Sequence, residues 1–255
     1  MDQNEYIVEI NTLKDKFQKE PNDIHIWSSL AIEALEASTL NNDFVNHRKY
    51  QVPSSNNTQP KLVERQPEQV IDILRNAFNF QLYYSVFTFS IAQVEAFLND
   101  LLFQVLSFDN RRLLTTIPGL VLKKQVELDE IISNESKESI IISVIKSNLI
   151  SIFYASPTKQ LEYIERITGV HLPESICQNW IEFKATRDLI VHNSGIINNL
   201  YIQKSGQNAR GIIGGRIIVD KPYFDNSIGQ MKSLIGKICN GIENQTKKVK
   251  ELVTQ

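Results

Sequence analysis

The chain has 255 residues, of which 42% are hydrophobic and 22% are charged, and its formal net charge is −2. This length and composition indicate a folded globular protein with one sizeable core and exclude a largely disordered chain. The near-neutral charge excludes a protein that coats nucleic acid through bulk positive charge, although it is compatible with a local basic groove. Any contact with RNA or DNA must therefore be concentrated in one place.

Cysteine usage and the start of the chain indicate the compartment. Cys177 and Cys239 have no CxxC spacing, and the opening MDQNEYIVEI lacks the basic and then apolar order of a signal peptide. These features favour a reduced, cytoplasmic protein. Residues 76–94 carry no charge over nineteen positions, close to the length that spans a bilayer. Seven Asn, Gln, Ser or Thr residues interrupt that stretch, so it predicts a helix buried among other helices and no membrane segment.

The N-terminal part predicts helices followed by a connection. Two helices are expected at about 2–19 and 23–40, because Pro21 lies between them and proline interrupts helices. Residues 46–67 are polar, contain three prolines and show no period, so they predict a linker or long loop. We expect residues 1–45 to form an N-terminal helical extension that packs on the rest of the chain as a regulatory or partner-facing addition.

The remainder, residues 68–255, predicts a helical domain. Its longest apolar pattern runs from Glu68 to about Phe108, which requires two stacked helices or one bent helix. Further helices are expected at 120–133, 137–152, 157–168 and 174–193. After Gly195, β-branched runs flank a Gly-, Asn- and Ser-rich segment, which predicts a small β-hairpin before the last helix. The fold class is therefore all-α, an antiparallel helical bundle with an N-terminal extension and a small hairpin.

An arginine stands five positions before a histidine twice, at Arg166 and His171 and at Arg187 and His192. The first pair straddles the helix-breaking Gly169, so its side chains lack a fixed relative position. The second lies in WIEFKATRDLIVHNSG, which predicts a continuous helix with a polar exit. At about 100° per residue its side chains point ~140° apart, so they would meet more easily on a substrate or partner. Spacing alone favours a simple helix end whose cations interact with the helix dipole.

Other motifs exclude common kinds of site. The four histidines are scattered, with no HExxH motif and no cluster at ligand spacing, so no metal is expected. The glycines within 211–215 are not followed by the Lys and Ser or Thr of a phosphate-binding loop. We therefore expect neither a metal nor a cofactor.

The stretch LEYIERITGVHLPESICQNWIEFKATRDLIVHNSGIINNLYI resembles bacterial stand-alone members of the HEPN superfamily. In that family an Arg, a polar residue, three mostly apolar residues and a His end a helix, often followed by Asn and Gly. Arg187, Asp188 and His192 match this motif, and Asn193 follows it. The segment SIAQVEAFLNDLL is similar to the HEPN core helix that packs beside the motif helix. The resemblance covers roughly residues 68–245.

The resemblance implies a HEPN-like bundle that acts as a metal-independent endoribonuclease. His192 would take the proton of an RNA 2′-OH, whose oxygen attacks the adjacent phosphorus and leaves 2′,3′-cyclic phosphate and 5′-OH ends. Arg187 would hold the phosphate, and Asp188 would orient Arg187 or His192. Asn193 and Glu95 are the expected supporting residues.

The same resemblance implies partners. HEPN proteins dimerise so that the motifs of two protomers face one cleft, which predicts a homodimer. Many are toxins or phage-defence effectors, so an antitoxin or a defence-system partner is expected by analogy. Two alternatives stay open: a non-catalytic HEPN module for dimerisation or RNA binding, and an adaptor for a partner protein.

Overall fold

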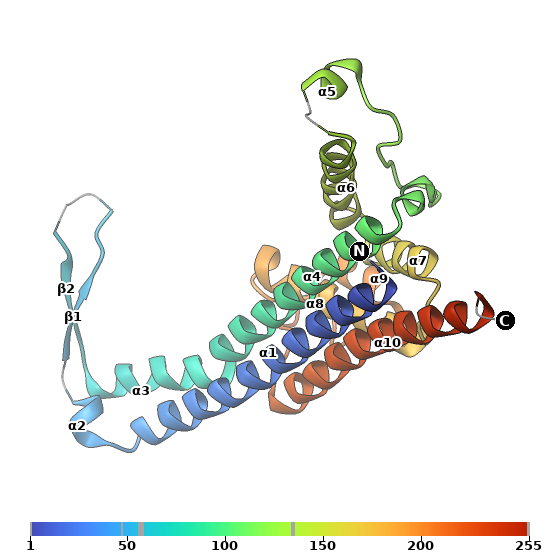
Figure 1. Ribbon diagram of the computed structural model, residues 1–255. Coiled ribbons are helices and arrows are strands. Elements are labelled where there is room, and N and C mark those ends of the chain that lie inside the picture. The colour runs from blue at the N-terminus through green and yellow to red at the C-terminus, as the bar shows by residue number, and fades with distance from the viewer. Residues whose placement is uncertain (1, 47, 56–58, 134–135, 254–255) are drawn as a thin grey trace.

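The computed structural model describes residues 2–46, 48–55, 59–133 and 136–253, and the fold is all-α, as predicted (Figure 1). The helices are α1 (Gln3–Ser38), α2 (Asn42–Val45), α3 (Pro67–Asn76), α4 (Leu82–Phe108), α5 (Leu128–Ser133), α6 (Lys137–Tyr154), α7 (Pro157–Thr168), α8 (Glu174–Asn193), α9 (Asn199–Ser205) and α10 (Lys221–Val253). The strands are β1 (Arg48–Val52) and β2 (Lys61–Arg65), which form an antiparallel pair. Short turns of other helix types lie at Ala77–Gln81, which is π-helical, and at Asn110–Leu114 and Gly206–Asn208, which are 3₁₀.

Helix α1 is continuous, whereas the sequence predicted two helices separated at Pro21. Its buried side chains Tyr6, Ile10, Phe17 and Ile24 lie on one face and belong to the main core, where α1 packs against α4 and α10. Packing on both sides of the proline outweighs the lost backbone hydrogen bond, which costs ~3 kcal/mol in a helix interior. The segment expected as an extension therefore contributes to the same core as the rest of the chain.

The predicted linker or long loop at 46–67 holds the hairpin. In its register Tyr50 lies opposite Val63, and Val52 lies opposite Lys61. The strands stand clear of the helices at one end of the molecule (Figure 1). Sequence reasoning missed them because each strand has only five residues and the connection between them is long and polar, so no clear alternation marks the pair.

The hairpin predicted after Gly195 does not form there, and this location is corrected. The segment contains α9 and a short 3₁₀ turn, and its strand-like pairing is a single bridge between Ile196 and Arg216. Asn198 caps α9 by accepting a hydrogen bond from the Tyr201 amide at 2.9 Å. This local cap and the burial of Tyr201 favour a helix where the β-branched residues suggested a strand.

Helices α3 and α4 join through the π-helical turn Ala77–Gln81 into one run, Pro67–Phe108, which settles the choice that the sequence left open. Within the described part of the chain, this run alone is long and apolar enough to cross a membrane by length and composition. Its side chains Phe87, Ile91 and Phe97 are fully buried against other helices. Half of the most apolar window of this run is buried inside the structure.

The helix predicted over 120–133 is also corrected, because residues 115–127 are irregular and only α5 is helical. The side chain of Asn148 on α6 accepts from the Lys123 amide at 2.6 Å and donates to the Lys123 carbonyl at 3.1 Å. These bonds replace those of a helix. Residues 115–127 form a lobe together with α5 and α6, and this lobe projects from the end of α4 (Figure 1). The helices predicted at 137–152, 157–168 and 174–193 are observed within two residues.

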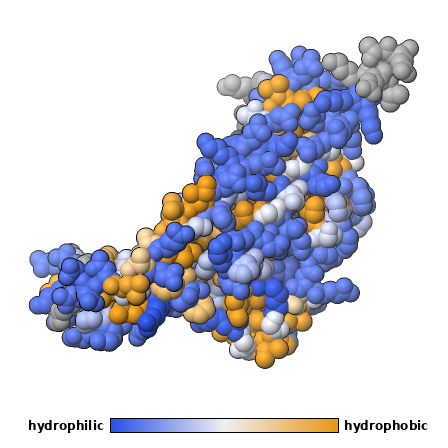
Figure 2. Space-filling view, turned by 90° about the horizontal axis from the view of Figure 1, so that it is seen from below, coloured by the Kyte–Doolittle hydropathy of each residue, from blue (hydrophilic) through white to orange (hydrophobic). Residues whose placement is uncertain are grey.

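The described residues form two hydrophobic clusters of different size. The main core joins α1, α4, α6, α7, α8 and α10, with Trp180 and Tyr163 among its largest buried side chains. A small second cluster consists of Val45, Val70 and Leu74. It lies in what we call the arm, formed by the end of α1, α2, the hairpin and α3. From below, the surface is mostly hydrophilic, and its apolar side chains gather in separate patches (Figure 2).

Candidate functional site

The motif residues Arg187, Asp188 and His192 occupy the last two turns of α8. The helix ends because Ser194 (φ 52°) and Gly195 (φ 75°) both adopt left-handed backbone conformations. Ser194 is the one residue other than glycine with a positive φ in the described ranges. This polar, left-handed exit matches the helix end that the sequence predicted.

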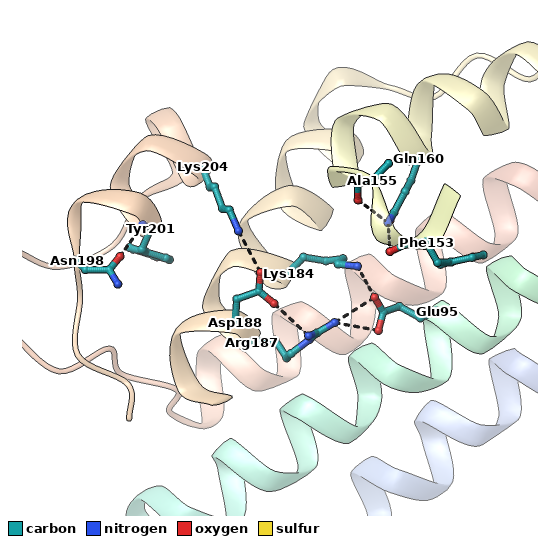
Figure 3. Close-up of polar contacts among 10 residues, drawn as sticks. All are labelled: Glu95, Phe153, Ala155, Gln160, Lys184, Arg187, Asp188, Asn198, Tyr201 and Lys204. Atoms are coloured by element: carbon teal, nitrogen blue, oxygen red, sulfur yellow. Dashed lines mark hydrogen bonds and ion pairs between the residues drawn. The ribbon is translucent and has the colours of Figure 1, made fainter. Parts of the chain in front are cut away.

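Arg187 points toward α4, where it meets Glu95. Its Nη2 donates to both carboxylate oxygens of Glu95, each at 3.1 Å (Figure 3). Lys184 Nζ donates to the same carboxylate. The Lys184 side chain is 8% exposed, whereas those of Arg187 and Glu95 are each 23% exposed. Glu95 therefore orients Arg187 from a neighbouring helix, and the structure brings these two predicted residues together.

Asp188 extends this cluster toward solvent. Its Oδ1 lies 3.0 Å from Arg187 Nη1, and its Oδ2 lies 3.2 Å from Lys204 Nζ on α9. Lys204 is the most exposed member, with 42% of its side chain accessible. Together with Lys184 and Glu95, these residues form one chain of charges running from α4 across α8 to α9 (Figure 3). Three cations face two carboxylates, so the chain carries an excess positive charge.

His192 lies one helical turn after Asp188 and is exposed. The two side chains, with Asn198 and Lys204, line a hollow of about 170 Å³ where α9 meets α8. Neither ring nitrogen of His192 has a hydrogen-bond partner among the described residues. A neutral imidazole offers one donor and one acceptor. The hollow is smaller than the 300–1,000 Å³ typical of ligand pockets, so it would hold only part of a larger molecule.

Arg187 and His192 make no direct contact in the described structure. Arg187 reaches toward Glu95 on α4, and His192 borders the hollow on the α9 side, which follows from the ~140° between positions five residues apart. Asp188 connects the two, because it pairs with Arg187 and shares the hollow with His192. The motif therefore presents a cation and an imidazole on adjacent surfaces of the chain.

Asn193 has a structural contact. Its side-chain Nδ2 donates to the carbonyl of Ile196, which closes the turn after the helix, and Asn193 also borders the hollow. The supporting role predicted for it therefore coincides with stabilisation of the helix end.

The other Arg and His pair straddles a helix end, as its context predicted. Arg166 lies in α7 and binds Glu162 at 3.2 Å, whereas His171 follows the helix, with its side chain 93% exposed. Gly169, with φ 68°, ends α7 between them. His171 Nδ1 lies 3.1 Å from Glu165, so each member of the pair has its own local partner.

A second carboxylate cluster lies on the opposite side of α8 and was not predicted. Glu182 is buried. Its Oε1 accepts from Thr186 Oγ1 at 2.6 Å, Tyr201 OH at 2.9 Å and Arg210 Nε at 3.1 Å. Its Oε2 accepts from Tyr223 OH at 2.7 Å. Glu182 and Thr186 have the spacing of a helical pair, but nothing in the sequence identifies the distant partners.

This cluster fastens the segment after α9 to α8. The guanidinium of Arg210 lies 3.4 Å from the centre of the Tyr223 ring, and Arg210 Nη1 donates to the Ile218 carbonyl at 2.6 Å. Burial, followed by the nearby Glu182 carboxylate, raises the pKa of Tyr201 and of Tyr223 above the ordinary value. Both hydroxyls therefore stay protonated near neutral pH and donate to Glu182.

Within the residues that the structure describes, no three His, Cys, Asp or Glu side chains are grouped to hold a metal ion. The groups at the end of α8 that can take part in chemistry are thus a guanidinium held by two carboxylates, an accessible imidazole and the ammonium of Lys204. Such groups can bind an anion and transfer a proton.

Comparisons with protein-family models, with curated proteins and with solved structures find no match for this chain. The resemblance to the HEPN superfamily therefore rests on the motif residues themselves, and its functional implications are taken up as a proposal.

Proposed function

We propose that this chain is a metal-independent endoribonuclease of the HEPN type. The observation that carries the proposal is the arrangement around Asp188, which binds Arg187 and shares a hollow with the exposed His192. A cation and a proton acceptor thus lie at one helix end, on different sides of α8, and Asp188 lies between them. Ribonucleotide cleavage through the 2′-OH needs these two functions and no other cofactor.

The proposed reaction begins with His192, which takes the proton of the 2′-OH as a general base. The 2′ oxygen attacks the adjacent phosphorus, and the bond from phosphorus to O5′ breaks. The products are a 2′,3′-cyclic phosphate and a 5′-OH end, which takes up a proton. Arg187 offsets the charge on the phosphate, and its Nε–H, which makes no hydrogen bond among the described residues, is available as a donor to it.

A homodimer fits this proposal. Arg187 and His192 point to different sides of α8 in one protomer, so two motif helices that face one cleft would surround the substrate more completely. We therefore propose a cytoplasmic homodimer that cuts RNA, with a toxin or phage-defence role and an antitoxin or defence-system partner by analogy with HEPN proteins.

The test is a cleavage assay with chelator-treated protein and with matched variants. His192→Ala should lower the cleavage rate by at least the ~10²-fold typical of losing a general base, and Arg187→Ala should do the same through lost phosphate binding. Both variants should keep the parent's melting temperature, since neither side chain belongs to the core. The controls are Arg166→Ala and His171→Ala, which have the same spacing and should change cleavage by no more than a few-fold.

The product ends and the assembly state complete the test. The fragments should carry cyclic phosphate and 5′-OH ends, and light scattering should give the mass of a dimer. Activity that returns only with a divalent metal, or motif variants that cut as well as the parent, would contradict the nuclease proposal. A dimer that binds RNA but leaves it uncut would instead support the non-catalytic module.

A further inference from the structure

The hairpin of the arm is an exposed β-ribbon, defined here as Arg48–Val52 paired with Lys61–Arg65. It projects from the end of the arm, away from the main bundle (Figure 1). A two-stranded ribbon without a covering layer contributes little to stability and exposes the edges of both strands. Its presence at the tip of the molecule therefore calls for an explanation other than core packing.

The ribbon has an unusual charge for this protein. It contains four cations, Arg48, Lys49, Lys61 and Arg65, and one carboxylate, Glu64. The whole chain has a net charge of −2, so the ribbon carries +3 and the other residues together carry −5. Lysines on edge strands also discourage pairing with other strands, but charges of either sign would serve that purpose. The excess of a single sign favours an anionic partner.

The register places an aromatic ring among these cations. Residues two apart in a strand share a face, and directly opposed residues share it as well. Tyr50 and Val52 therefore lie on the same face as Lys61, Val63 and Arg65. Tyr50 has 38% of its surface accessible, and Lys61 is exposed. An exposed aromatic ring between basic side chains is the arrangement that binds single-stranded nucleic acid, by base stacking and phosphate contact.

We propose that the ribbon is a second RNA-binding surface, on which Lys61 and Arg65 contact phosphates and Tyr50 stacks on a base. This inference rests on the proposed ribonuclease function and deepens it, because it names a contact for the substrate far from the motif. The proposed ligand is single-stranded RNA, because the basic side chains and the aromatic ring lie on the same face of the ribbon and can bind phosphates and a base together.

The position of the ribbon sets the length of RNA that can use it. Gly195, just after the motif, lies beside Tyr84 in the first turn of α4. From Tyr84 the helical run leads back to Pro67 at the base of the ribbon, a distance of about 25 Å at 1.5 Å per residue. An RNA of only about four nucleotides would therefore reach one site but not both, whereas one of about 30 nucleotides would reach both.

The experiment measures the binding of single-stranded RNA to the full chain by fluorescence anisotropy at several salt concentrations. The probe is a 2′-O-methyl RNA of about 30 nucleotides, which lacks the attacking hydroxyl and is not cut. The double variant Lys61→Gln with Arg65→Gln should bind about tenfold more weakly, and its salt slope should fall by about 1.4, for two lost phosphate contacts. The control, Lys19→Gln with Lys237→Gln, removes the same charge from the exposed faces of α1 and α10.

A third variant separates stacking from charge. Tyr50→Ala should weaken binding by about fivefold or more and leave the salt slope unchanged, because stacking involves no counterion release. With a probe of about four nucleotides, which cannot bridge the two sites, the ribbon variants should lose less affinity than they lose with the long probe, because the motif still binds the short RNA. All variants should keep the parent's melting temperature, since the ribbon stands apart from the core.

The outcomes distinguish this proposal from the ribonuclease proposal. If the ribbon variants bind the long probe as tightly as the control variant, the ribbon proposal is overturned, even when the parent cuts RNA and His192→Ala abolishes cutting. If the parent cuts no RNA but binds it through the ribbon, the nuclease proposal fails and the ribbon proposal holds. A parent chain that binds no RNA overturns the ribbon proposal directly.

Discussion

Helix α8 carries two carboxylate-centred clusters on opposite sides, and they differ in how fully their donors are used. Around Glu182, four side chains from α8, α9, α10 and the segment before α10 donate to a buried carboxylate. Around Glu95, two cations share a partly exposed carboxylate, and Arg187 keeps an Nε–H without a partner among the described residues. The first arrangement uses all the donors around its carboxylate, whereas the second leaves one donor of Arg187 unused among the described residues.

Removal of the buried carboxylate should have the largest effect on stability. Glu182→Ala leaves Arg210 without its counter-ion and three hydroxyls without an acceptor, so we expect the free energy of unfolding to fall by about 3 kcal/mol. Urea denaturation followed by circular dichroism measures this loss. The control is Glu162→Ala on α7, whose ion pairs with Lys159 and Arg166 are near the surface and should contribute under about 1 kcal/mol. Equal losses in the two variants would show that the buried Glu182 stabilises the fold no more than Glu162 near the surface does.

A change at the partly exposed carboxylate should affect activity more than stability. Glu95→Gln keeps the shape of the side chain but removes the charge that orients Arg187, so the cleavage rate should fall by about tenfold. The melting temperature should stay close to that of the parent. Asp100→Asn is the matched control, because Asp100 lies on the same helix and, like Glu95, lines a groove between α4 and α6. A loss of stability without a loss of cleavage would place Glu95 with the structural residues.

The smallest expected effect is on the pH dependence of stability, which should involve the tyrosines around Glu182. Burial and Glu182 raise the folded-state pKa of Tyr201 and Tyr223 above the ordinary 10.0. A raised pKa means that this contribution to stability is complete below pH 10.0 and is lost as the pH rises through the folded-state pKa. The urea midpoint should therefore decrease above about pH 10, and Tyr201→Phe should make that decrease shallower. An identical pH profile for parent and variant would show that Tyr201 does not contribute to the alkaline loss of stability.

Local signals explain which parts of the fold could be predicted. The bounds of α7 and α8 follow from residues at their ends, namely Pro157, Gly169, Pro173 and the turn after Asn193. Pro21 predicts a break from local sequence alone. The helix continues through it because α1 packs along α4 and α10, and the local sequence does not show this packing. The same holds for residues 115–127, which depend on Asn148 about 25 positions away along the chain.

The candidate site was predictable only in part, for a similar reason. The motif residues and Glu95 were identified through a family resemblance, and the structure places Arg187 against Glu95. The cluster around Glu182 was missed because its donors lie 19, 28 and 41 residues away in the sequence. A glutamate between the apolar Ile181 and Phe183 gives no pattern by which its distant partners can be recognised.

The arm is held by the small cluster of Val45, Val70 and Leu74, so we expect it to unfold locally more easily than the main core. Three buried side chains give far less resistance to local opening than the core beneath α4, so the arm can exchange its amide protons while the body stays closed. If RNA binds the folded ribbon and not the locally unfolded arm, bound RNA would slow this amide exchange. Under the ribbon proposal, the order of the arm would therefore depend on bound RNA.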